Sequence, residues 1–143
     1  MVLQFVTIAV AFVWAGCIMA ISFMEAWLKF RAPGVSTPIG LGIGKLIFNA
    51  LNKMEWVFAA IILVCCIIGA AINVTVTIWF VISGCILLVQ TIWLLPALEV
   101  RASSIINGKT PSPSTLHWYF VGAEFLKILT LIILGWNLFI IAV

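Results

Sequence analysis

Residues 59–72 read AAIILVCCIIGAAI, an apolar run that decides the fold class. In a strand of an outer-membrane barrel polar and apolar residues alternate, and in this run they do not. Because backbone groups in lipid must find partners within their own segment, the run predicts a helix. Runs of roughly 20 apolar residues cross a hydrocarbon core of about 30 Å, and such runs predict spans at about 2–27, 55–72, 74–98 and 116–143. We therefore predict an all-α polytopic membrane protein, a single four-transmembrane-helix bundle over residues 1–143.

The composition of the whole chain excludes other classes of protein. Of the 143 residues, 66% are hydrophobic and 8% are charged, and the mean hydropathy is +1.36. A soluble domain carries about 25% charged residues, so the chain is neither a soluble globule nor a disordered segment. It also lacks the basic surface that binds nucleic acid. The lipid bilayer is therefore its expected partner.

The start of the chain predicts a span rather than a secretory signal. The first residues, MVLQ, carry no basic side chain. The apolar run that follows is longer than the roughly 7–15 residues typical of a signal peptide. We expect residues 2–27 to stay in the membrane.

Proline and glycine shape the first connection. We expect the first helix to be broken by Pro33, Gly34 and Pro38. Gly40, Gly42 and Gly44 then indicate a flexible segment, and the second helix is expected to begin near Leu46, ahead of its span.

The third connection carries its own helix signals. Pro96 is expected to kink the end of the third span and to free a backbone carbonyl. Asn107 and Gly108 predict a turn. Two prolines follow, so the fourth helix is expected to begin only after a cap at Ser114 or Thr115.

The basic residues predict the orientation in the membrane. All seven lie at the first and third connections or just inside the fourth helix, namely Lys29, Arg31, Lys45, Lys53, Arg101, Lys109 and Lys127. The positive-inside rule places both connections in the cytoplasm and both termini outside, in a bacterial inner membrane. The Lys127 side chain is expected to snorkel toward the cytoplasm.

The acidic residues predict a binding site. There are four, all glutamates, one on each helix and each near the cytoplasmic end. A carboxylate within a bilayer needs a partner or water, so we expect the glutamates to converge inside the bundle with the single histidine. The predicted polar cluster contains Glu25, Asn52, Glu55, Glu99, Arg101, His117, Glu124 and Lys127.

A simpler interpretation of the acids is a set of local ion pairs that finish helix ends. Glu25 precedes Lys29 by four residues, Glu124 precedes Lys127 by three, and Glu99 neighbours Arg101. In either interpretation no charged residue is expected at the membrane midplane or in the outer half. That distribution argues against ion conduction.

Metal and cofactor chemistry find little support in the sequence. A di-iron bundle needs two Glu-x-x-His motifs, and His117 is the single histidine. The cysteines form no C-x-x-C and are expected to pack as small apolar residues, at positions 17, 65, 66 and 85. We predict no metal site, and the sequence identifies no cofactor.

Three classes of function remain open. The first is a binding or transport-accessory protein whose cytoplasmic-side cluster holds an amphipathic small molecule or a cation. The second is a membrane enzyme on a lipophilic substrate, with Glu55 or Glu124 as general acid or base and His117 assisting. The third is a structural subunit of a larger complex. Small residues such as Gly16 and Ala20 also favour self-association into a homo-oligomer.

Two family resemblances accompany these hypotheses. W-x-G at residues 14–16, KFRAPGV at 29–35, GKLIF at 44–48, P-x-L-x-x-R at 96–101 and LHW at 116–118 resemble the small four-span membrane proteins of a domain-of-unknown-function family found in bacteria and animals. That resemblance implies four spans and no activity. In topology, the chain is also similar to the membrane-associated eicosanoid and glutathione metabolism enzymes. Their N-x-x-E motif is matched by Asn52 and Glu55, whereas Phe48 stands where they carry arginine.

Overall fold

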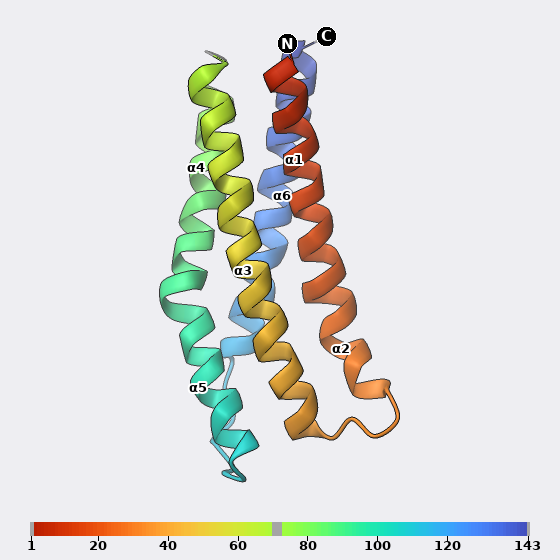
Figure 1. Cartoon of the computed structure of the whole chain (residues 1–143). Helices are drawn as coiled ribbons and strands as arrows, with labels where there is room; N and C mark the ends of the chain where they lie inside the picture. Colours follow the sequence, from red (N-terminus) through yellow and green to blue (C-terminus); the bar gives the residue numbers. More distant parts are fainter. Residues whose placement is uncertain (1, 70–72, 143) are drawn as a thin grey trace.

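The structure, a computed structural model, describes residues 2–69 and 73–142. Four long helical rods run alternately up and down the molecule (Figure 1), over Val2–Arg31, Thr37–Ile68, Val74–Ile106 and Leu116–Ala142. Each rod is long and apolar enough to cross a membrane. Over residues 2–69 and 73–142 there is no strand, so the all-α prediction is confirmed.

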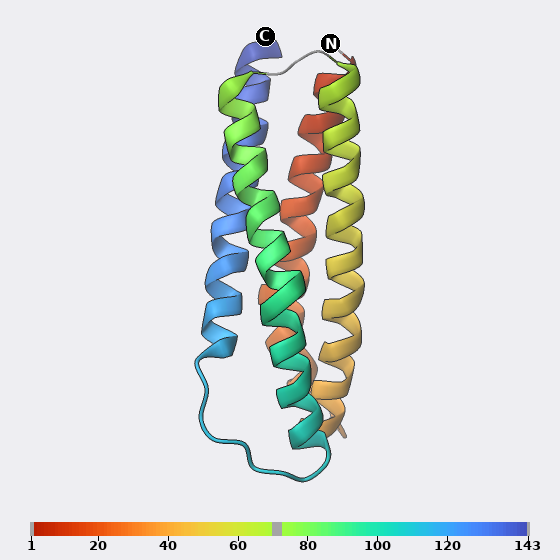
Figure 2. The ribbon, with the colours of Figure 1, turned by 90° about the vertical axis from the view of Figure 1, so that its left-hand side faces the viewer.

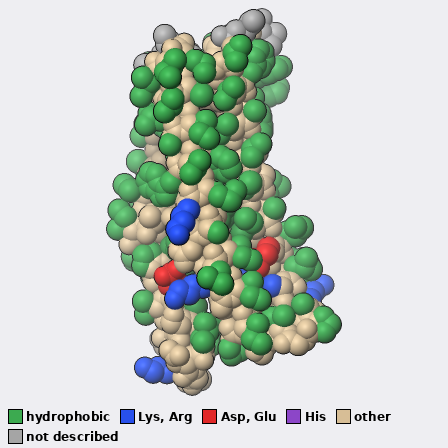
Figure 3. All heavy atoms as spheres, in the orientation of Figure 1, with side chains coloured by type: hydrophobic (Ala, Val, Ile, Leu, Met, Phe, Trp, Pro, Cys, Tyr) green, Lys and Arg blue, Asp and Glu red, His purple; other side chains and the backbone are tan. Residues whose placement is uncertain are grey.

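The two ends of the bundle differ in what they carry. Both chain termini lie at one end, which we name the terminal end, as Figure 1 and Figure 2 show. The connections over residues 32–36 and 107–115 lie at the opposite end, which we name the connection end. Figure 3 shows one face of the molecule. On this face hydrophobic side chains cover the half toward the terminal end, and the charged side chains lie in the half toward the connection end.

Two of the rods are interrupted by π-helical turns. In these turns a backbone N–H donates five residues back instead of four, as Leu95 does to the Gln90 carbonyl. Such turns change the direction of the side chains and often occur at functional sites. The elements are α1 (Val2–Ile18), the π-helical η1 (Met19–Glu25), α2 (Ala26–Leu28), η2 (Lys29–Arg31), α3 (Thr37–Ile68), α4 (Val74–Val89), the π-helical η3 (Gln90–Leu94), α5 (Leu95–Ile106) and α6 (Leu116–Ala142).

The second rod begins earlier than the sequence predicted. Helix α3 starts at Thr37 rather than near Leu46, with Pro38 in its first turn. Proline is tolerated there because its missing N–H has no helical partner in any case. A Cβ on Gly40 would overlap the Phe30 ring, so this glycine lets the first rod pack closely. The predicted flexible segment is therefore wrong.

The third connection follows its sequence signals more closely. Helix α5 ends at Ile106, and Gly108 has a φ of 76°. The Ser114 hydroxyl accepts a hydrogen bond from the Leu116 N–H at 3.2 Å, where α6 begins. The predicted turn and cap are confirmed. Pro96 lies in the first turn of α5 without ending the rod, and the irregularity expected there lies just before it, in η3.

The packing of the bundle leaves a narrow core and a wide apolar exterior. The core is built mainly of aliphatic side chains around one tryptophan, namely Ala11, Trp14, Ala15, Ile18, Ala59, Ile62, Val76, Leu87, Ile128, Leu131, Leu134 and Leu138. Large hydrophobic side chains also point outward along all four rods. A soluble monomer rarely exposes apolar surface on this scale, so the exterior fits contact with lipid.

Candidate functional site

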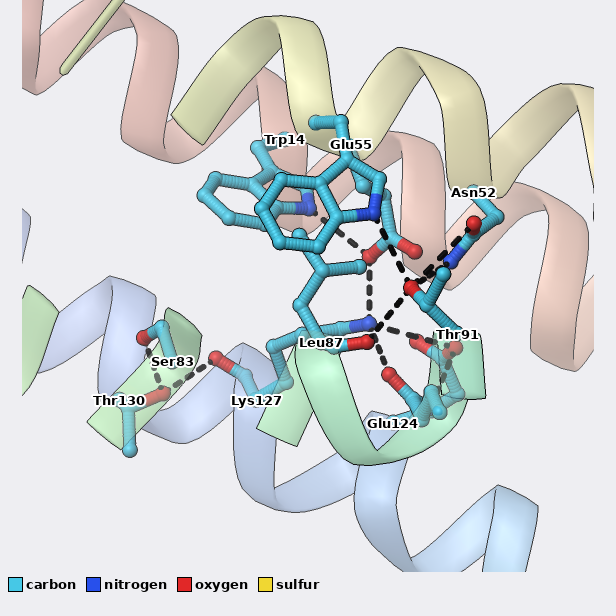
Figure 4. Close-up of polar contacts among 11 residues, drawn as sticks. Trp14, Asn52, Glu55, Ser83, Leu87, Thr91, Glu124, Lys127 and Thr130 are labelled. Atoms are coloured by element: carbon cyan, nitrogen blue, oxygen red, sulfur yellow. Dashed lines mark hydrogen bonds and ion pairs between the residues drawn. The ribbon is translucent and has the colours of Figure 1, made fainter. Parts of the chain in front are cut away.

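A charged side chain lies fully buried inside the bundle. The Lys127 side chain is 0% exposed, and its Nζ lies 2.5 Å from Glu55 Oε1 and 3.5 Å from Glu124 Oε1. Its Nζ also donates to the Gln90 side-chain carbonyl. Figure 4 shows Lys127 reaching from α6 toward Glu55 on α3, with Glu124 beside it. Lys127 therefore links α6 to α3 and to η3.

Two uncharged donors complete this arrangement. Trp14 Nε1 donates to Glu55 Oε1 at 2.9 Å, and Gln90 Nε2 donates to Glu124 Oε1 at 2.9 Å. We name these five residues the buried charge network; none is more than 2% exposed. Because α1, α3, η3 and α6 each contribute, the network connects all four rods. A buried charge is tolerated only when it is paired and hydrogen-bonded.

Local helix geometry places the α6 and η3 members of the network. Glu124 and Lys127 are three residues apart, so they share one face of α6. Gln90 begins the π turn η3 and points at Lys127, while Thr91 points at α3 and receives a hydrogen bond from Asn52 Nδ2 at 2.9 Å. Successive residues of a helical turn point in different directions, so the neighbouring side chains of Gln90 and Thr91 face different rods. One turn of η3 therefore contacts two neighbouring rods.

The depth of the network corrects two predictions. Lys127 lies roughly 16 Å along α6 from Leu116, where the helix begins at the connection end, at about 1.5 Å per residue. Its ammonium group is enclosed by carboxylates and does not snorkel to an end of the bundle. Glu55 lies about halfway along α3 because this helix begins at Thr37. The expectation that every acid lies near a helix end is therefore wrong.

A second polar site lies at the connection end. A cavity of about 140 Å³ lies between the first rod, α3, α5 and the start of α6, and its surface is mainly apolar. We name it the connection-end cavity. Its charged or titratable lining residues are Lys29, Lys45, Glu99 and His117, and its other lining residues are Ala26, Phe30, Leu41, Gly44, Phe48, Leu95, Leu98 and Ala102.

The charged residues around this cavity differ in their pairing. Lys29 Nζ lies 3.3 Å from Glu25 Oε2, which confirms that predicted pair. Glu99 accepts a hydrogen bond from the Asn49 amide. Lys45 donates to Ser103 Oγ at 3.3 Å, and among the residues that the structure describes it makes no ion pair. Lys45 is thus the cation at this cavity whose charge is not already matched by a carboxylate.

The predicted polar cluster is divided between these two places. Glu55, Glu124 and Lys127 belong to the buried charge network, whereas Glu99 and His117 line the connection-end cavity. The predicted convergence of all four glutamates is wrong, because the first three rods extend beyond their predicted spans and separate the members along the bundle.

The remaining three members of the predicted polar cluster belong neither to the buried charge network nor to the lining of the connection-end cavity. Glu25 reaches the cavity through its pair with Lys29, and Asn52 contacts Thr91. The Arg101 guanidinium donates to the Ser112 carbonyl at 2.7 Å and does not pair with Glu99. The predicted Glu99–Arg101 pair is therefore wrong, and Arg101 instead fastens α5 to the third connection.

The placement of these residues bears on catalysis. The sequence predicted Glu55 or Glu124 as a general acid or base with His117 assisting. His117 lines the connection-end cavity, and neither glutamate does. The predicted catalytic set is therefore not assembled at this cavity. Among residues 2–69 and 73–142, no group of three or more histidine, cysteine or acidic residues is arranged to hold a metal ion.

Fold and site together define a bundle of four apolar helices whose enclosed charge network joins all four. Comparison with family models, with curated proteins and with solved structures finds no match to this chain. The two resemblances noted in the sequence thus remain predictions.

Proposed function

We propose that this chain is an integral inner-membrane protein that binds an amphipathic anion at its connection end. Its rods are long and apolar enough to cross a membrane, and their outward side chains are mainly apolar. Five of the seven basic residues lie at the connection end, namely Lys29, Arg31, Lys45, Arg101 and Lys109. The positive-inside rule then places this end in the cytoplasm.

The observation that carries the binding proposal is an apolar cavity with Lys45 among its lining residues. Leu95, Leu98 and Phe48 line the cavity, and Lys45 makes no ion pair among the described residues. A cavity of similar size, about 150 Å³, accommodates benzene in another protein. The connection-end cavity therefore suits the apolar part next to a head group rather than a whole lipid.

The Lys45 ammonium group favours an anionic head group over a cationic one at this cavity. Lys29 is already paired with Glu25, and the Glu99 carboxylate already accepts from the Asn49 amide, whereas Lys45 has only the Ser103 hydroxyl as a polar partner among the described residues. The head group of a bound anion would meet Lys45, and a charge-assisted hydrogen bond contributes about 1.5–3 kcal/mol. The ligand class is thus an acid with an attached apolar group, such as a fatty carboxylate or a lipid phosphate.

Binding of three probes to the protein in lipid nanodiscs tests this proposal. Dodecanoate, dodecanol and dodecyltrimethylammonium share a chain and differ in the charge of the head. We expect dodecanoate to bind most tightly, and Lys45→Met to weaken it by about tenfold, which is about 1.4 kcal/mol. Lys53→Met removes an exposed lysine outside the cavity and is the matched control. Equal affinity for the three probes, or equal affinity in both lysine variants, would contradict the proposal.

Substituted-cysteine labelling tests the proposed orientation. In a background freed of the native cysteines, a cysteine at Lys109 and one added after the last residue should react from opposite sides of the membrane. Lys109 follows α5 at the connection end, and the chain terminus lies at the other end. Reaction of both from the same side would overturn the orientation.

A further inference from the structure

A stripe of polar side chains runs along one face of α3 from the connection end to the buried charge network. Lys45, Asn49 and Asn52 are spaced by four and three residues, so they share a helix face. Each bonds across to the third rod, where the respective partners are Ser103, Glu99 and Thr91. We name these three α3 residues and their partners the polar stripe. Glu55 continues the same spacing and belongs to the network.

Toward the terminal end buried polar side chains become sparse among the described residues, and Thr7, which is buried there, donates to the Leu3 carbonyl of its own helix. Thr130 Oγ1 donates to the Lys127 carbonyl at 2.8 Å and lies 2.7 Å from Ser83 Oγ. Beyond this pair the core contains aliphatic side chains such as Leu131, Leu134 and Leu138. The network therefore has polar neighbours leading toward the connection end and an apolar core on the other side.

The network contains one more acid than base. Its titratable groups are Glu55 on α3 and Glu124 and Lys127 on α6, while Trp14 on α1 and Gln90 on η3 are neutral. With all three ionised, the network would hold one uncompensated negative charge with at most 2% exposure of any member. An uncompensated buried charge is strongly unfavourable, and such groups neutralise instead.

The hydrogen bonds of the two glutamates indicate where a neutralising positive charge would bind in the network. Glu55 Oε1 accepts from Lys127 and Trp14, and Glu124 Oε1 accepts from Gln90 and Lys127. Glu124 Oε2 is buried and has no partner among the described residues. A metal cation needs several oxygen ligands at once, whereas a proton needs one.

We propose that the buried charge network is a proton-binding site, with one exchangeable proton held by the Glu55–Glu124 pair and reached through the polar stripe. The proton comes from water at the connection end, binds a carboxylate oxygen and returns the same way, with no electron transferred. The five residues of the network do not line the connection-end cavity, whereas Lys45 and Glu99 of the polar stripe do.

Infrared spectroscopy of the protein in lipid bilayers at neutral pH tests the site. We expect a carboxylic acid C=O stretching band that shifts in D₂O. Glu124→Gln and Glu55→Gln each leave one carboxylate opposite Lys127, so each should abolish the band. Glu99→Gln and Glu25→Gln change acids outside the network and should leave it intact. Absence of the band in the unmodified protein, or its persistence in both network variants, would overturn the proposal.

The rate of hydrogen–deuterium exchange of the same band tests the path. Asn52→Leu interrupts the polar stripe next to the network, and we expect it to slow the exchange by tenfold or more. Ser83→Ala alters the polar pair on the terminal side and should leave the rate unchanged. Equal slowing by both variants, or none by Asn52→Leu, would contradict access from the connection end.

Discussion

Replacing Lys127 with methionine removes the cation at the centre of the buried charge network while keeping a long apolar side chain. Lys127 is fully buried and is the cationic partner of Glu55 and Glu124 within the described residues. Breaking a buried ion pair by removing one partner costs about 3–5 kcal/mol. Trp14 and Gln90 still donate to the two carboxylates. We therefore expect Lys127→Met to lower the free energy of unfolding by about 3 kcal/mol, the lower end of that range.

Reversible unfolding in mixed micelles, titrated with sodium dodecyl sulfate, measures this loss. Lys53→Met changes an exposed lysine on α3 and should alter the free energy by no more than about 0.5 kcal/mol. Adding Glu55→Gln and Glu124→Gln to Lys127→Met removes the uncompensated charges. That triple variant should recover most of the stability, since neutral groups of similar volume often replace a buried ion pair without loss. A loss as small as that of Lys53→Met, or no recovery in the triple variant, would refute the reasoning.

Three further predictions use the same unfolding assay. Trp14→Phe loses the 2.9 Å hydrogen bond to a carboxylate and should cost about 1.5–3 kcal/mol, whereas a loss no larger than that of the exposed control Trp136→Phe would contradict the bond. Ser83→Ala and Thr130→Val remove a 2.7 Å contact, so their double-mutant cycle should show coupling of about 0.6 kcal/mol, and zero coupling would argue against it. A Cβ on Gly84, within α4, meets nothing within 4 Å, so Gly84→Ala should stabilise by roughly 0.5–1 kcal/mol, and destabilisation would show that the space is filled.

The sequence predicted the helical class because that prediction rests on summed properties of long segments. Four apolar runs, one turn at Gly108 and one cap at Ser114 are local signals, and the structure contains them. The start of α3 was missed because Pro38 and Gly40 are normally helix breakers. The first turn of a helix accepts the proline, and contact with Phe30 gives the glycine its role.

The buried charge network was only partly predictable. Glu124 and Lys127 are three residues apart, so their pairing is visible in the sequence. Their contact with Glu55 depends on how α3, which begins at Thr37 ahead of its apolar run, packs against α6. Gln90 stands out as a polar residue inside an apolar span, and this signal could have added it to the site. The W-x-G motif contains Trp14 but does not indicate the hydrogen bond from its indole to Glu55, because that bond comes from the packing of α1 against α3.

Measuring the contact between Lys127 and Glu55 in a lipid bilayer is the most direct test of the buried charge network. Solid-state NMR on protein labelled with ¹⁵N at lysine Nζ and ¹³C at glutamate Cδ measures it through their dipolar coupling. A Glu25→Gln background removes the separate Lys29–Glu25 pair, whose atoms lie 3.3 Å apart. With Lys127 Nζ 2.5 Å from Glu55 Oε1, we expect a strong coupling that Glu55→Gln reduces to the weaker coupling with Glu124, whose Oε1 lies 3.5 Å from Lys127 Nζ. A Lys127 Nζ that shows no coupling to a glutamate carboxyl carbon and exchanges freely with bulk water would contradict the account.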